Sequence, residues 1–147
     1  MEKKELRELY FAVLTEIYGF TEFELDKSNE IWFNYEGNYY FLFVDEKDIK
    51  TIELNFYCPQ KFKDNDEKLK AIHLFNLINK KFKMVKMFTD DETGYITARI
   101  DLYVTGILSI NNGFVFTDKQ QFIEQLLEAI TAIQSATEYF FDKMGWD

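Results

Sequence analysis

The spacing of the hydrophobic residues constrains this chain most strongly, because it changes between a strand period and a helix period along the sequence. Residues 95–104 alternate strictly, with Ile96, Ala98, Ile100, Leu102 and Val104 on one side of an extended segment. Residues 31–36, 39–45 and 51–57 alternate in the same way. Strict alternation is typical of strands that bury one face. The sequence therefore predicts an antiparallel sheet.

Three other segments have apolar residues three and four positions apart, which is typical of amphipathic helices. The first runs to about Ile17, and Gly19 is its expected stop. The second follows Asp64 or Asp66 as N-cap and continues to Phe82. The third begins at Thr117-Asp118-Lys119-Gln120, which fits a capping box with glutamine at the third helical position, and reaches about residue 143.

These segments, with a short strand at 84–88, predict an α+β fold in the order α-βββ-α-ββ-α, as one domain over residues 1–147. Residues 22–30 are interpreted as a polar connector, and residues 106–116 either extend the sheet or form a loop. Gly37-Asn38 is the expected two-residue hairpin turn. That turn would pair Glu36 with Tyr39, Asn34 with Phe41, and Trp32 with Phe43.

The net charge narrows the classes of partner. The 147 residues carry a formal charge of −9, with a pI near 4.7. Such a field repels phosphate backbones and anionic membrane surfaces. It favours a basic peptide or protein as partner, and the alternative, a merely solvated acidic surface, is the commoner explanation of such a charge. No apolar run approaches the ~20 residues needed to span a bilayer. The lone Cys58 and the charged N-terminal residues indicate the cytoplasm as the default location.

Candidate catalytic and metal-binding residues are sparse. His73 is the only histidine, and nothing in the sequence brings it to Cys58. The acidic run Asp90-Asp91-Glu92 lacks the ligand spacing of a calcium loop. The sequence therefore favours a protein that is not an enzyme, with no cofactor and no metal site.

The two faces of the predicted sheet differ in composition. The face expected in the core is rich in aliphatic residues: Ile31, Phe33, Leu42, Val44, Ile52, Leu54, Phe56, Ile96, Ile100 and Leu102. The opposite face combines aromatic and polar residues, and tyrosine and tryptophan are enriched at protein interfaces. Either another segment of the chain, such as 106–116, covers this face, or it binds a partner or a second copy. The candidate interaction residues are Trp32, Tyr39, Phe41, Phe43, Tyr57 and Tyr103.

The element order resembles the type III secretion chaperone-like fold, and within it the YbjN-type family. The segments that carry this resemblance are IWFNYEGNYYFLFVD, KLKAIHLFNLINKKF followed by MVKMF, GYITARIDLYV, and FTDKQQFIEQLLEAI. The resemblance implies a non-enzymatic α+β module that is often dimeric. Secretion chaperones of this fold bind extended client segments on hydrophobic patches, and YbjN-type proteins are described as regulators.

The leading hypothesis is therefore a protein- or peptide-binding module, chaperone-like or regulatory, with a homodimer through the aromatic face as one form. The alternative is a small-molecule sensor or enzyme with a pocket between sheet and helices. A concave pocket around His73 with convergent polar groups would favour that alternative.

Overall fold

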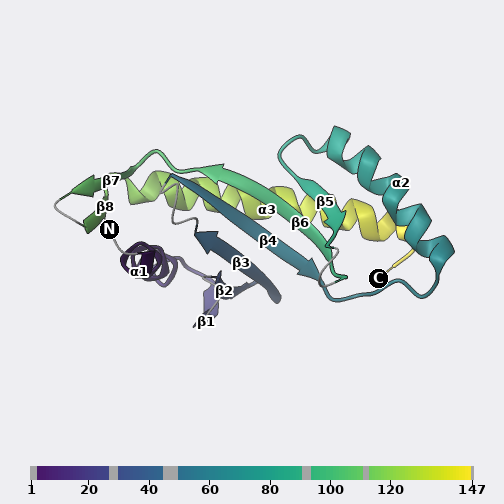
Figure 1. Cartoon of the computed structure of the whole chain (residues 1–147), viewed down its shortest axis with the longest axis horizontal. Coiled ribbons are helices and arrows are strands. Elements are labelled where there is room, and N and C mark those ends of the chain that lie inside the picture. Colours follow the sequence, from purple (N-terminus) through teal and green to yellow (C-terminus); the bar gives the residue numbers. More distant parts are fainter. Residues whose placement is uncertain (1–2, 27–29, 45–49, 91–93, 111–112, 147) are drawn as a thin grey trace. The chain divides into compact units, whose positions relative to one another are not determined.

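The structure is a computed structural model that describes residues 3–26, 30–44, 50–90, 94–110 and 113–146 (Figure 1). Its elements along the chain are α1 (Lys3–Leu14), β1 (Phe20–Leu25), β2 (Glu30–Tyr35), β3 (Asn38–Val44), β4 (Thr51–Cys58), α2 (Asn65–Lys81), β5 (Lys86–Thr89), β6 (Ile96–Tyr103), β7 (Ile107–Ile110), β8 (Gly113–Phe116) and α3 (Lys119–Met144).

The strands form a six-stranded sheet in the order β1-β2-β3-β4-β6-β5 and a separate two-stranded sheet of β7 and β8. The pairs β1–β2, β2–β3, β5–β6 and β7–β8 are antiparallel. The predicted α+β class with an antiparallel sheet is confirmed. Residues 106–116, for which two outcomes were open, form the β7–β8 hairpin.

The chain groups into two compact units. The first unit contains Met1–Leu54 and Asp101–Leu127, and the second contains Asn55–Ile100 and Glu128–Asp147. Strands β4 and β6 and helix α3 each contribute residues to both units. The single domain over residues 1–147 stays a prediction.

The core of the first unit is largely aromatic. Phe33 of β2 is fully buried, with Phe20 of β1 stacked on it at 4.5 Å between ring centroids and Tyr40 of β3 at 5.7 Å. Tyr10 of α1 meets the rings of Phe116 and Phe122 edge-on. Edge-to-face and offset contacts of this kind add to the free energy of apolar burial.

The core of the second unit lies between α2, the C-terminal part of α3, and β5. Phe75 of α2 stacks on Phe140 of α3 at 5.3 Å, and Trp146 meets the Phe140 ring at 90°. Figure 1 shows α2 running beside β5. The side-chain amide of Asn79 on α2 accepts a hydrogen bond from the Met87 N–H at 2.8 Å and donates one to the Met87 C=O at 3.3 Å.

All ten residues predicted for the core face of the sheet are buried, from Ile31 to Leu102. The connector prediction was wrong for residues 22–25, which belong to β1, and for Glu30, which begins β2, whereas residues 27–29 lie outside the described residues. β1 is an edge strand whose polar residues hide its period. A bulge between Thr21 and Glu24, where Glu22 has φ of 55°, interrupts the alternation further.

The predicted hairpin turn was also wrong. Glu36 and Gly37 form the turn, with φ values of 53° and 85°, so Trp32 pairs with Phe41 and Asn34 with Tyr39. Two-residue turns of this kind need positive φ at both positions. The register therefore differs from the predicted one by two residues, which leaves every side chain on its predicted face.

Two predicted helix ends need correction, and one cap is confirmed. α1 ends at Leu14, and Gly19 (φ 88°) lies in the turn that follows. The Asp118 carboxylate accepts from the Gln121 N–H, so Asp118 rather than Thr117 caps α3. Asp64 caps α2 by accepting from the Glu67 N–H at 2.8 Å. In the described part of the chain, no helix combines the length and the apolarity that crossing a membrane requires.

Candidate interaction surface on the sheet

The β2–β3 hairpin places four of the predicted interaction residues on one sheet face of the first unit. Trp32 lies directly opposite Phe41, and Tyr39 and Phe43 lie two residues before and after Phe41 along β3. Side chains opposite one another on antiparallel strands share a face and contact each other. The Trp32 and Phe41 rings do so, with centroids 3.7 Å apart and planes at 89°.

Exposure divides these residues into two roles. Phe41 is only 4% exposed, although the sequence predicts it as a contact residue, because the Trp32 ring lies against it. Trp32 and Phe43 are half-buried, whereas Tyr39 is 44% exposed and Tyr103 on β6 is 59% exposed. Phe41 therefore supports the surface, and the two tyrosines and Trp32 present it. We call Trp32, Tyr39, Phe41, Phe43 and Tyr103 the aromatic face.

Hydrogen bonds hold the Trp32 ring in place. Its Nε1–H donates to the Asp26 carboxylate at 3.0 Å, and the same carboxylate accepts from the Glu30 N–H at 3.3 Å. Arg7 of α1 donates to the Asp26 backbone carbonyl at 3.1 Å. Sequence reasoning missed Asp26, because it lies in the segment interpreted as a connector. A fixed aromatic side chain loses little conformational entropy on binding a partner.

Tyr39 is held by a carboxylate of the edge strand. Its hydroxyl donates to Glu22 Oε2 at 2.9 Å. This hydrogen bond is the main cause that raises the pKa of Tyr39 above its ordinary value near 10, and the negative charge of Glu22 adds to the effect. Glu22 itself lies in the β1 bulge with positive φ. The bulge therefore turns a carboxylate onto the aromatic face.

The Tyr39–Glu22 hydrogen bond predicts a pH dependence. A phenol whose pKa is raised in the folded state contributes stability that is fully present below its unfolded pKa and is lost as pH rises through the folded pKa. The bond should thus be fully present below about pH 10 and be lost only as the pH rises through the raised pKa of Tyr39 in the folded protein. A tyrosine ¹³Cζ NMR titration should show that Tyr39 ionises at a higher pH in the wild type than in Glu22→Gln. Equal midpoints in the two proteins would contradict the assignment.

The segment that could have covered the aromatic face packs elsewhere in the first unit. Phe116 of β8 contacts Tyr10 of α1 and Phe122 of α3, which belong to the helix side of the core. Among the described residues of 106–116, the aromatic ring contacts are those of Phe116 with α1 and α3. The exposed rings of Tyr39 and Tyr103 agree with an open face.

Tyr57, the sixth predicted residue, belongs to the second unit. Its ring stacks on Tyr95 at 5.9 Å, and the Lys61 ammonium lies 5.4 Å from the Tyr95 ring centre. Nearby, Arg99 donates from Nε to Asn55 Oδ1 at 2.9 Å and lies over the Phe88 ring at 5.0 Å. Arg99 thus satisfies the side chain of the buried Asn55, and the hydroxyl of the buried Thr97 donates to the Tyr95 carbonyl at 3.4 Å.

The whole net charge belongs to the first unit. Its residues include 16 acidic and 7 basic side chains, a formal charge of −9, whereas the second unit has ten of each and is neutral. Glu24 lies opposite Trp32 in the β1–β2 register, and strand alternation places Glu53 and Asp101 on the same face as Tyr103. Carboxylates therefore surround the aromatic face.

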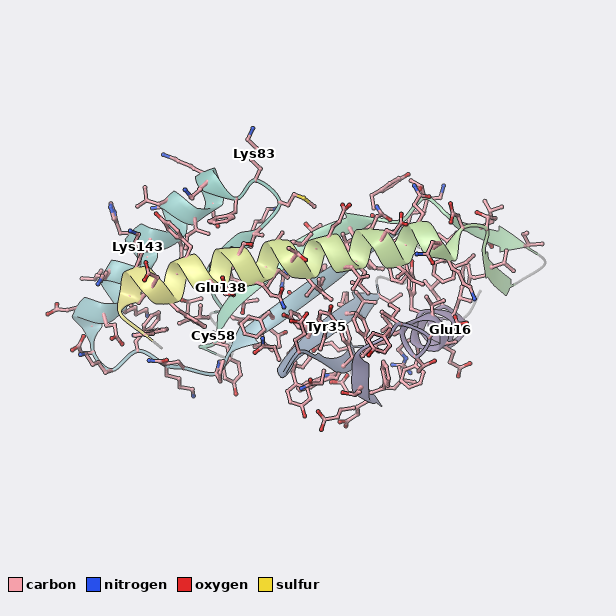
Figure 2. The ribbon with its side chains drawn as sticks, turned by 180° about the vertical axis from the view of Figure 1, so that it is seen from behind. Glu16, Tyr35, Cys58, Lys83, Glu138 and Lys143 are labelled. Carbon is pink, nitrogen blue, oxygen red and sulfur yellow. The ribbon has the colours of Figure 1, made fainter. Side chains whose placement is uncertain are left out.

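The two residues considered for catalysis, His73 and Cys58, differ in their surroundings. His73 is exposed on α2, and Cys58 (labelled in Figure 2) is buried. Burial raises the pKa of the Cys58 thiol, which disfavours the reactive thiolate. Within residues 3–26, 30–44, 50–90, 94–110 and 113–146, no three metal-ligating side chains come together. Asp91 and Glu92 of the predicted acidic turn lie outside these ranges.

A groove of the second unit lies between α2 and β5, has a volume of about 470 Å³, and does not include His73. Lys68 is the one ionisable residue among those that line it. Comparison of the chain with known protein families finds no matching family model, and comparison with curated proteins finds no match.

Proposed function

We propose that the protein is a non-enzymatic binding module whose first unit binds a basic segment of another polypeptide on the aromatic face. The observation that carries this proposal is the combination of exposed tyrosine rings with the entire net charge of −9 in that unit. Lysine and arginine bind such a surface in two ways. Their charges interact with the surrounding carboxylates, and their cationic groups lie over aromatic rings.

The same charge argues against two copies meeting through this face. Two surfaces of equal sign repel each other, and the repulsion is strongest where the charges approach most closely. The groove between α2 and β5 gives little support for the alternative of an enzyme, because Lys68 is the only titratable residue in its described lining. A basic polypeptide is therefore the occupant that the proposal names.

The test uses an eight-residue peptide that alternates valine with lysine, and a matched peptide with glutamate in place of lysine. We expect the lysine peptide to bind the ¹⁵N-labelled protein and to shift the Trp32 indole resonance. Its affinity should fall as added salt screens the charges. Replacing the exposed Tyr103 by alanine should weaken binding about tenfold, because one ring of the contact is lost. Its backbone hydrogen bond from Gln125 is kept, so folding should be little affected.

Tyr18→Ala is the matched control, because Tyr18 is a tyrosine of the same unit that is almost fully exposed in the turn before β1. It should bind the lysine peptide like the wild type. Equal binding by Tyr103→Ala and the wild type would contradict the proposal. So would equal affinity for the lysine and glutamate peptides, or a dimer in light scattering that Tyr103→Ala dissociates.

A further inference from the structure

The outer edge of β5 faces the groove of the second unit. β5 is the terminal strand of the six-stranded sheet, with β6 as its single neighbour in the sheet order. Asp90, just after β5, donates its N–H toward β6 by bonding the Tyr95 carbonyl. Because backbone groups alternate in direction along an antiparallel strand, the N–H and C=O of Met87 and Thr89 point away from β6.

Asn79 already binds this edge in the way a neighbouring strand would. Its amide oxygen accepts from the Met87 N–H, and its amide nitrogen donates to the Met87 C=O. A side-chain amide has the same donor and acceptor groups as a peptide bond. The geometry at Met87 therefore fits one residue of an antiparallel strand, whose own C=O and N–H would take the place of the Asn79 amide.

The rest of the groove offers both apolar and polar contacts. Ile72 of α2 is 44% exposed at its wall, and Phe75 lines it beside Ile72. Thr89 Oγ1 is buried and has no hydrogen-bond partner among the described residues. Lys68 is the one charged residue of the described lining, and its ammonium group favours a carboxylate on whatever binds here.

We propose that the groove binds an extended acidic segment of a partner polypeptide, which adds as a strand to the edge of β5. Strand addition takes its affinity from main-chain hydrogen bonds and its specificity from pockets for alternate side chains. The incoming backbone replaces the Asn79 amide at Met87, and a small apolar side chain lies against Ile72. In the absence of a partner, Asn79 protects the edge from unspecific pairing. This site is separate from the aromatic face and prefers the opposite charge.

The valine–glutamate peptide is the probe. Added to the ¹⁵N-labelled full chain, it should shift the backbone amides of Met87 and Thr89 and the side-chain amide of Asn79, and leave the Trp32 indole unchanged. Asn79→Ala should bind it about fivefold more tightly, because the peptide no longer competes with the side chain for Met87. A groove that bound the peptide by apolar contact alone would not gain affinity from this change.

Two variants at exposed positions of α2 keep the test valid even if Asn79→Ala does not fold. Ile72→Glu should weaken binding of the glutamate peptide about tenfold, since it removes an apolar contact and adds a like charge. Leu77→Glu is the matched control, because Leu77 is 45% exposed and does not line the groove. It should bind like the wild type.

Several results would overturn the proposal. One is the absence of chemical shift changes along β5 at peptide concentrations up to about 1 mM, because a dissociation constant above that value is too weak for a specific site. Another is weaker or unchanged binding in a folded Asn79→Ala. Equal binding of the lysine peptide at β5 would refute the charge preference. Shifts along β5 that depend on protein concentration without peptide would identify a second copy as the occupant instead.

Discussion

Replacing Phe33 by alanine is expected to lower the free energy of unfolding by ~3–5 kcal/mol, because a fully buried ring is lost and the cavity can close only in part. Phe33 has no exposed surface and lies between the rings of Phe20 and Tyr40. Urea denaturation followed by circular dichroism measures the change. The midpoint should fall while the slope with urea stays constant, provided that the compactness of the unfolded state is unchanged.

Phe43→Ala is the matched control for Phe33→Ala, because it removes the same ring from the opposite face of the same hairpin. Phe43 is half-buried, so replacing it should lower the free energy of unfolding by clearly less than Phe33→Ala does. Equal losses for the two variants would mean that the aromatic face is as closely packed as the core. That result would also remove the physical basis for a binding surface there.

Replacing Phe140 by alanine should destabilise the second unit by a similar ~3–5 kcal/mol, because Phe140 is fully buried where α2 meets α3. Its ring stacks on Phe75 and meets the Trp146 indole at 90°. In a Trp32→Phe background Trp146 is the single tryptophan, since the chain has two. Its fluorescence should therefore report both the lower urea midpoint and the loss of a contact in the folded protein.

Phe141→Ala serves as the control for Phe140→Ala. The Phe141 ring is also near Trp146, with ring centroids 6.1 Å apart, but Phe141 is half-buried. Its replacement by alanine should therefore lower the free energy of unfolding by less. The Trp146 Nε1–H also donates to Glu67 at 3.2 Å, so the indole keeps one contact in either variant. A Phe140→Ala variant with an unchanged urea midpoint would show that α2 and α3 do not depend on this stack.

The aromatic face shows which parts of a binding surface can be predicted from alternation alone. Alternation assigned Trp32, Tyr39 and Tyr103 to the face opposite the core, and the register error in the hairpin did not matter because a shift of two residues preserves the face. Alternation could not reveal that Phe41 is buried, because its cover is the Trp32 ring on the adjacent strand. Nor could it identify Asp26 as the acceptor for the indole.

Other differences from the prediction have the same origin in contacts that are distant in sequence. β1 has a polar sequence because it is an edge strand, and residues 20–25 form a strand because they pair with β2. Glu36 takes positive φ in a turn where Gly37-Asn38 was expected, and the Asn34 side chain accepts from the Gly37 N–H within it. A strained turn residue is held by the pairing on either side of it.

The chain on its own determined the α+β class, the positions of most elements and the face to which each strand residue belongs. Those properties follow from the period of apolar residues, which is local and is read over a few neighbours. The tertiary structure decided the strand order, the division into two units, the concentration of the negative charge in one of them, and the position of the outer edge of β5 beside α2. Each of these depends on segments far apart in the sequence, and their pairing is settled by the packing free energy of the whole fold.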